Sequence, residues 1–342
     1  MAALSHQQTF RVLLQQAAGE GRGAVLFGDS LQRAQEAVPP FLVGDEFPYV
    51  YLEHPLIDDP SLDVTLVLGP LEPGTRIDSP AAGEHGSMLD QYAELRGLYN
   101  DVCFGFEIDT KEPTLPMAGI HFQPRAHTEL VRPFCEAIGE PERAGLYLDL
   151  AARIPDTWSL SYFGMFRGRP GSPLRVCGYL DDAERVACAQ DAGRLREVFE
   201  TVGFSAYDDA MLAQASALME AATGCRSIDF QFDVFPDGRL GEVFAFDVSF
   251  VAERPEGVRK SFADGTGAHV MQLFEGWGIA DGRWQLAVES AFARSVLVQT
   301  AFGETRPFAL ALTPKWAKAR WTRGVLQPAK LYHLMKADFL DE

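Results

Sequence analysis

Carboxylates alternate with large apolar side chains in two short stretches of the sequence. In residues 227–235, Asp229, Gln231 and Asp233 occupy every second position, and residues 104–109 repeat the pattern with Glu107 and Asp109. Successive side chains of a β-strand point to opposite faces, so each stretch predicts a strand with one apolar and one acidic face. Carboxylates inside a protein can accept a proton as general bases or bind a cation. The same pattern fits an open sheet whose polar face is half-solvated.

Basic side chains are concentrated near the end of the chain. Residues 306–336 hold seven Lys or Arg and no acid, whereas the rest of the chain has 23 basic and 48 acidic residues. Alternation places Lys318 and Arg320 on one face of a strand, and Lys330 and Tyr332 on one face of the next. If these rows are buried, desolvation requires that an anionic ligand or facing carboxylates accompany them. Alternatively, the rows face solvent, where lysines resist edge-to-edge pairing of strands.

The elements that must position these residues are pairs of strands. Five pairs of strand-like runs are each joined by turn residues, such as the Pro-Asp-Gly at 236–238, and each pair predicts an antiparallel hairpin. The pairs are 48–54 with 62–69, 102–109 with 117–123, 158–166 with 174–180, 227–235 with 240–250, and 308–322 with 327–336.

Helical sequence separates the strand pairs. In residues 208–222, apolar side chains recur at helical spacing and give one apolar face. Further helices are expected at 88–99, 128–139, 141–154, 192–203, 255–276 and 282–295, and a short strand is expected at 24–27, after a glycine-rich linker.

Ten antiparallel strands can bury these helical faces if the sheet closes into a barrel with the helices outside. A barrel of that size leaves a lumen in which chemistry can occur. Because no linker or change of composition divides the chain, we expect one domain over residues 1–342, in preference to two α+β domains divided near residue 155 or 205.

Composition and charge exclude several classes of protein. The chain has 342 residues, 47% of them hydrophobic, and a formal net charge of −18. This sign argues against nucleic acid or an anionic membrane as a partner. No apolar run is long enough to cross a bilayer, and five scattered cysteines fit a reducing compartment, so we expect a cytoplasmic protein without disulfides. The cysteine and histidine spacings do not predict a structural zinc site.

Several segments resemble the ABBA or PT-barrel prenyltransferases. The order of five helix-and-hairpin units is similar over nearly the whole chain. Residues 62–67 (LDVTLV) resemble the strand that in some members places an aspartate near magnesium. Residues 175–179 (RVCGY) resemble the family's cationic strand ending in tyrosine, and residues 330–334 (KLYHL) resemble the Lys-x-Tyr strand that holds diphosphate in many members. The family usually has another Arg or Lys on the strand at 241–250, where this chain has Glu242 and Asp247.

The resemblance implies a fold and a reaction. The fold would be a ten-stranded antiparallel β-barrel ringed by α-helices, an α+β architecture built from five ααββ units. The activity would be transfer of a prenyl group from an allylic diphosphate to an aromatic small molecule or a peptide side chain. We expect the acceptor to be deprotonated by Asp229, Asp233 or Glu107, and magnesium, where required, to bind at Asp63. The diphosphate would be held by Arg175, Tyr179, Lys318, Arg320, Lys330 and Tyr332.

Two further expectations concern the ligand. Trp316, Trp321 and Tyr332 lie among the cations in the sequence, and their rings could shield an allylic cation. The alternative function is a noncatalytic barrel of the same fold that binds an amphiphilic or cationic small molecule. In either case we expect a monomer.

Overall fold

The computed structural model describes residues 14–16, 22–37, 49–68, 103–110, 119–124, 127–137, 139–166, 171–251, 254–299 and 305–339. Its strands are β1 (Tyr49–Pro55), β2 (Asp63–Leu68), β3 (Cys103–Asp109), β4 (Gly119–Gln123), β5 (Trp158–Met165), β6 (Leu174–Leu180), β7 (Ser227–Val234), β8 (Leu240–Ser249), β9 (Phe292–Gln299), β10 (Thr305–Thr322), β11 (Val325–Leu326) and β12 (Lys330–Phe339).

The described part of the chain also contains a 3-10 helix (Thr128–Leu130) and a series of α-helices. These are α2 (Arg22–Phe27), α3 (Ser30–Ala37), α5 (Val131–Ala137), α6 (Glu142–Ala151), α7 (Asp182–Gln190), α8 (Ala192–Val202), α9 (Asp209–Ala221), α10 (Pro255–Asp264), α11 (Thr266–Gly276) and α12 (Arg283–Glu289). None of the described helices is long and apolar enough to cross a bilayer.

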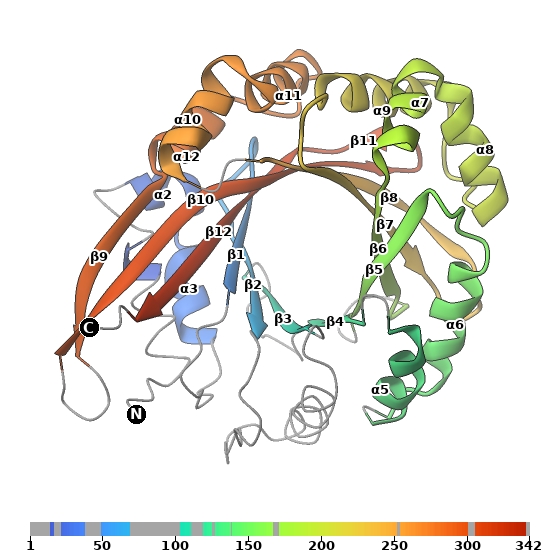
Figure 1. The fold of residues 1–342 in the computed structure, drawn as a ribbon, viewed down its shortest axis with the longest axis horizontal. Helices are drawn as coiled ribbons and strands as arrows, with labels where there is room; N and C mark the ends of the chain where they lie inside the picture. The colour runs from blue at the N-terminus through green and yellow to red at the C-terminus, as the bar shows by residue number, and fades with distance from the viewer. Residues whose placement is uncertain are drawn as a thin grey trace.

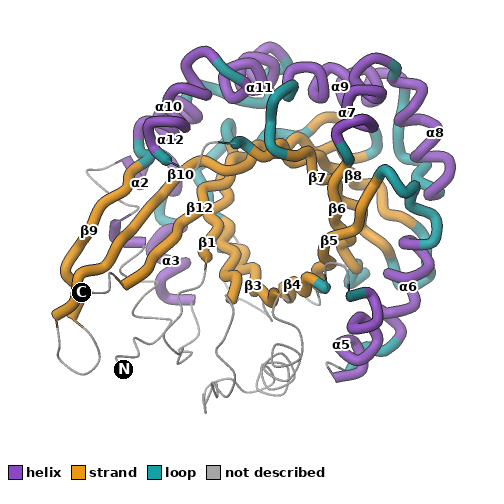
Figure 2. Tube along the Cα trace, viewed as in Figure 1, coloured by secondary structure: helices purple, strands orange, loops and turns teal. Residues whose placement is uncertain are grey.

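The strands form one strongly curled antiparallel sheet. Each of the five predicted strand pairs is present as antiparallel neighbours: β1–β2, β3–β4, β5–β6, β7–β8 and β10–β12. The hydrogen-bonded order is β11-β10-β12-β1-β2-β3-β4-β5-β6-β7-β8, and β9, which is not part of this order, pairs with β10. β10 also pairs with β8 through residues 316–322, which brings the two ends of this order beside each other (Figure 2).

Helices cover the outer face of the sheet. α7, α8 and α9 pack beside one another, as do α10 and α11, and together they form a layer outside the strands (Figure 1). Phe230 and Phe232 of β7 and Phe244 of β8 are fully buried, and Phe199 of α8 packs edge-on against Phe244 with ring centroids 4.9 Å apart. The core therefore lies between sheet and helices, and the apolar face of the acid-bearing β7 meets the helices as alternation predicted.

Two local predictions are wrong. Residues 24–27 belong to helix α2, in which Leu26 and Phe27 are buried, because a four-residue apolar run fits a buried helical turn as well as a strand. The helix predicted at 282–295 ends at Glu289, and the β-branched and aromatic residues that follow form β9. The helix expected at 88–99 lies outside the described residues. Among the described residues, the sheet has twelve strands in place of the ten predicted, because β9 and the two-residue β11 also pair with β10.

Candidate functional site

Two adjoining cavities lie within the curled sheet. The first, of about 190 Å³, has wall residues from every strand except β9 and β11; we call it the aromatic chamber, after Tyr51, Tyr162, Trp316 and Tyr332. The second, of about 500 Å³, is lined mostly by acidic and basic side chains. We call it the charged chamber, after Asp63, Asp233, Arg320 and Lys330. Five residues belong to both walls and mark the boundary: Glu53, Glu107, Arg175, Gln231 and Lys318.

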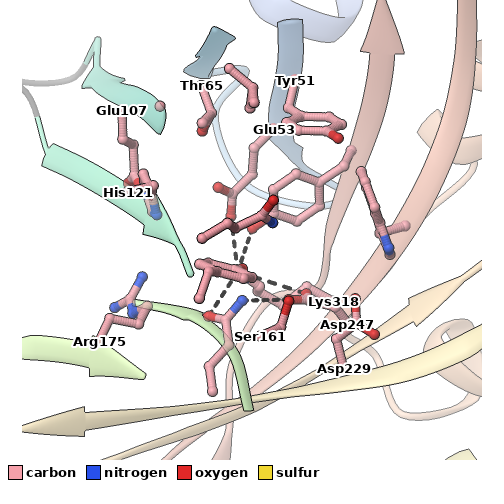
Figure 3. A pocket seen from close by; sticks show the side chains of 17 residues that line it. Tyr51, Glu53, Thr65, Glu107, His121, Ser161, Arg175, Asp229, Asp247 and Lys318 are labelled. Carbon is pink, nitrogen blue, oxygen red and sulfur yellow. Dashed lines mark hydrogen bonds and ion pairs between the residues drawn. The ribbon is translucent and has the colours of Figure 1, made fainter. Parts of the chain in front are cut away.

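Lys318 occupies the centre of this boundary. Its Nζ donates hydrogen bonds to the Tyr332 hydroxyl and to Gln231 Oε1, the latter at 3.2 Å. The same atom lies 3.8 Å from Glu53 Oε1 and 3.7 Å from Asp247 Oδ1 (Figure 3). With only 6% of its surface exposed, Lys318 makes polar contacts from β10 to residues of four other strands, β1, β7, β8 and β12. The burial of this ammonium group is tolerated because two carboxylates accompany it.

Lys330 is held between two carboxylates at the start of β12. Its Nζ lies 2.9 Å from Asp63 Oδ2 and 3.0 Å from Glu53 Oε1. Burial tends to raise the pKa of Glu53, but the positive charges of Lys330 and Lys318 lower it overall. Burial likewise tends to lower the pKa of Lys330, but the charges of Glu53 and Asp63 raise it overall. Glu53 and Lys330 are therefore both ionised at neutral pH.

Arg175 and Asp233 form a two-pronged ion pair in the wall of the charged chamber. The two residues are directly opposite each other on β6 and β7. Arg175 Nε donates to Asp233 Oδ1 at 2.9 Å, and Nη2 donates to Oδ2 at 3.3 Å. This geometry is the strong, directional mode in which a guanidinium binds either a carboxylate or a phosphate.

Asp229 and Asp247 form a pair of carboxylates in the aromatic chamber. They face each other across β7 and β8, opposite the Glu107–His121 pair, whose nearest atoms are 3.0 Å apart (Figure 3). The Ser227 hydroxyl donates to Asp229 at 2.9 Å. Burial raises the pKa of Asp229 to about 7 and the pKa of Asp247 to about 6. Each carboxylate can therefore gain or lose a proton near neutral pH, as a general base must.

Most residues predicted as site residues lie in these walls. Those in one or both chambers are Asp63, Glu107, Arg175, Asp229, Asp233, Lys318, Arg320, Lys330 and Tyr332. Tyr179 lines neither chamber and is 46% exposed. It shares a strand face with Arg175 but lies at the other end of β6, because alternation determines the face and not the height along the strand.

Two further residues lie outside the lumen. Glu242 is exposed and pairs with Arg323 at 2.6 Å. It lies five positions before Asp247 on β8, an odd number, and therefore points to the opposite face of the strand. Trp321 is fully buried on the outer face of the sheet, where its Nε1 donates to Gln214 Oε1 of α9 at 2.9 Å. Neither residue contacts the chambers, so Glu242 does not replace a cation there and Trp321 does not shield a ligand.

Sequence reasoning missed Glu53, which contacts both lysines of the site. The signal was present in β1, where Tyr51 and Glu53 alternate with the buried Val50, Leu52 and His54. This is the same alternation that identified β7, and it places Tyr51 and Glu53 on the inner face.

The acids around Asp63 do not fit a metal site. Asp63 directs one oxygen to the ammonium group of Lys330, and Glu53 shares that lysine. Among the described residues, no group of three or more His, Cys, Asp or Glu side chains is arranged to hold a metal ion. We therefore derive no chemical step through magnesium.

Comparison with known proteins identifies the fold. The sequence matches no protein-family model and no curated protein. The 5-dimethylallyltryptophan synthase of Streptomyces coelicolor aligns with a TM-score of 0.52 at 9% identity, over 97% of each chain. The same enzyme in complex with DMASPP and Trp aligns with a TM-score of 0.52 at 10% identity, over 98% of this chain and 95% of that chain.

A second neighbour has the same architecture. PriB in a binary complex with product diphosphate aligns with a TM-score of 0.51 at 11% identity, over 97% of this chain and 96% of that chain. At these identities the likeness concerns the fold. The chain thus has the fold of aromatic prenyltransferases, which the resemblance in its sequence predicted.

Proposed function

We propose that this protein transfers a prenyl group from an allylic diphosphate to an aromatic acceptor. One observation carries the proposal: a chamber whose wall holds four cations adjoins a chamber that contains aromatic rings, and Lys318 at their boundary donates a hydrogen bond to Tyr332 of the aromatic chamber. A leaving diphosphate and the hydrocarbon cation it leaves behind need these two environments side by side. We further propose that the pairing of β10 with both β12 and β8 makes the ten inner strands a closed barrel that excludes water from the cation.

The residues divide between the two ends of the reaction. Arg175, Arg320 and Lys330 would bind the diphosphate in the charged chamber, and Lys318 would hold the oxygen that leaves with the electron pair of the C–O bond. The rings of Trp316 and Tyr332 would face the allylic cation, and they are already in contact, with centroids 6.3 Å apart and edge-on.

The proton of the acceptor would go to Asp229. Asp229 lines only the aromatic chamber, and its pKa of about 7 suits a base at neutral pH. Asp233 lines only the charged chamber and is engaged with Arg175, so it is a poorer candidate for this role. Glu107 borders both chambers and is a second candidate, with His121 as the partner that would share the proton.

The test is a product assay with the full chain. Purified protein is incubated with dimethylallyl diphosphate and a panel of aromatic acceptors that begins with tryptophan, and mass spectrometry detects an acceptor enlarged by one dimethylallyl group. Tyr332→Phe removes the hydroxyl that contacts Lys318 and should lower the rate, whereas Tyr179→Phe removes a hydroxyl outside both chambers and should not. If no acceptor is prenylated and no allylic diphosphate binds to the folded protein, the noncatalytic alternative replaces this proposal.

A further inference from the structure

We propose that Asp233 and Asp63 pair with the cations that would bind diphosphate, so that the diphosphate binds only by displacing these carboxylates. This inference rests on the proposed function, because it concerns the ligand of the charged chamber. It assigns to the two aspartates a role in selecting the anion, in place of base catalysis or metal binding.

The first displaced contact is the pair of Arg175 with Asp233. The side chains are 16% and 13% exposed, and two of the guanidinium N–H groups are already used by the two carboxylate oxygens. A phosphate that made this same side-on contact would need the Nε and Nη2 donors that Asp233 now uses. For this contact, Asp233 and a phosphate compete for the same donors.

The second displaced contact is the pair of Lys330 with Asp63. Glu53 of β1 and Asp63 of β2 are directly opposite each other, and Lys330 contacts both. Glu53 also lies near Lys318, so its negative charge is shared between two lysines. If Asp63 turned away, Lys330 would keep one carboxylate partner while its other side became available to a phosphate oxygen.

The balance of charge gives the reason for displacement. The wall of the charged chamber contains four cations (Arg175, Lys318, Arg320 and Lys330) and four acids (Glu53, Asp63, Glu107 and Asp233). While each cation is paired with an acid, its charge is largely balanced at close range, and an anion is attracted strongly only when a carboxylate moves away from its cation. An anion with a single negative charge offers Arg175 no more than Asp233 already offers, whereas a diphosphate carries more charge and more acceptor oxygens. The pairs thus favour diphosphate over weaker anions.

The experiment measures binding of inorganic pyrophosphate by titration calorimetry in a phosphate-free buffer. Asp233→Asn keeps the size of the side chain and removes its charge, and it should bind pyrophosphate about tenfold to a hundredfold more tightly than the unmodified protein, the usual worth of a charge-assisted pair. The affinity of this variant for orthophosphate should rise by at least the same factor, so that the ratio of pyrophosphate affinity to orthophosphate affinity does not increase and is expected to fall. Asp63→Asn should show a smaller gain, because Glu53 still holds Lys330.

Glu242→Gln is the matched control. It removes a carboxylate from an arginine pair of 2.6 Å on the exposed surface and should leave pyrophosphate affinity unchanged. Circular dichroism establishes that each variant is folded, and Asp63→Asn decides the question if Asp233→Asn does not fold.

The inference is overturned if the folded Asp233→Asn and Asp63→Asn proteins bind pyrophosphate no more tightly than the unmodified protein. Weaker binding would show that the aspartates position the cations for the ligand, and loss of binding in Asp63→Asn with magnesium present would show a metal ligand. The proposed function fails separately, if neither pyrophosphate nor dimethylallyl diphosphate binds to the unmodified protein or to either variant; this inference then fails with it.

Discussion

Acidification from pH 7 to pH 5 should destabilise the protein through His333. His333 of β12 and His54 of β1 are completely buried and stacked, with ring centroids 5.2 Å apart, and Phe27 of α2 packs edge-on against both. His333 Nε2 lies 3.4 Å from the carbonyl oxygen of Ala287 in α12. Within the described part of the chain, His54 Nε2 and His333 Nδ1 have no hydrogen-bond partner. A proton added here therefore gains no carboxylate partner from the contacts described.

The size of the effect follows from the shift in pKa. Burial lowers the pKa of His333 from 6.5 to about 4, and burial with the charge of His333 lowers the pKa of His54 as well. Between pH 6.5 and about pH 4, His333 binds a proton in the unfolded chain but not in the native protein, so the free energy of unfolding falls as pH falls. At roughly 1.4 kcal/mol per pH unit, His333 alone should cost about 2 kcal/mol between pH 6.5 and pH 5. A typical domain has about 5–15 kcal/mol of stability, so the loss is measurable.

The assay is urea unfolding of the unmodified protein and of His333→Phe at pH 7, 6 and 5. The comparison is needed because Asp229 and Asp247 have raised pKa values, and such groups stabilise the native state as pH falls towards 4. Phenylalanine keeps a planar ring beside His54 and cannot titrate. The stability advantage of the unmodified protein over the variant should fall by about 2 kcal/mol from pH 7 to pH 5. A difference that stays constant across this range would refute the reasoning, because it would mean that His333 titrates alike in the folded and unfolded chains.

Three other outcomes are expected. Lys330→Ala should weaken binding of dimethylallyl diphosphate by at least about tenfold in calorimetry, while Lys330→Arg should keep part of the affinity. If Lys330→Ala bound this ligand as tightly as the unmodified protein, Lys330 would not be part of the diphosphate site. Asp229→Asn should lower kcat by roughly 10²–10⁴-fold. In the unmodified enzyme, kcat/KM should rise with pH through about 7, because only the deprotonated carboxylate accepts a proton. A kcat/KM that does not change with pH would indicate another base. Gly178→Ala should lower the free energy of unfolding in urea by about 1–3 kcal/mol, because the added Cβ would overlap the Ser159 carbonyl oxygen and lie 2.6 Å from Phe230 Cζ. An unchanged unfolding midpoint would show that β5 and β7 can move apart to accommodate the methyl group.

The hairpins could be predicted because each carries its own local signals. In β7 and β8, alternation and the turn at 236–238 specify both strands and the faces of their side chains. Prediction failed where the local signal was ambiguous. A four-residue apolar run at α2 and a mixed stretch at β9 fit helix or strand equally well, and tertiary packing decided between them.

The sequence could predict which side chains of the site share a face of a strand, but not their position along the barrel or their interaction partners. Alternation predicted which side chains share a face of a strand, and the structure shows that the faces of Lys318, Lys330 and Asp229 point inward, a choice that the sequence left open. Alternation could not show that Tyr179 lies outside both cavities. The role of Glu53 depends on β1 lying beside β12, a contact between residues almost 280 positions apart in sequence. No local pattern contains that information, because it is set by how the sheet curls back on itself.

The basic and acidic side chains that the sequence places in rows contact one another in the lumen, so the same ion pairs affect both the stability of the protein and its binding of an anion. The two hypotheses for the basic rows, an anionic ligand or facing carboxylates, are both consistent with one chamber if the carboxylates hold the cations until the ligand arrives. Removing Asp233 would leave Arg175 partly buried without its counter-charge, which costs stability in the absence of ligand. The same substitution should raise affinity for pyrophosphate, so stability and affinity should change in opposite directions. A loss of both would mean that Asp233 supports the fold and positions Arg175 for the ligand, and that the ligand does not displace it.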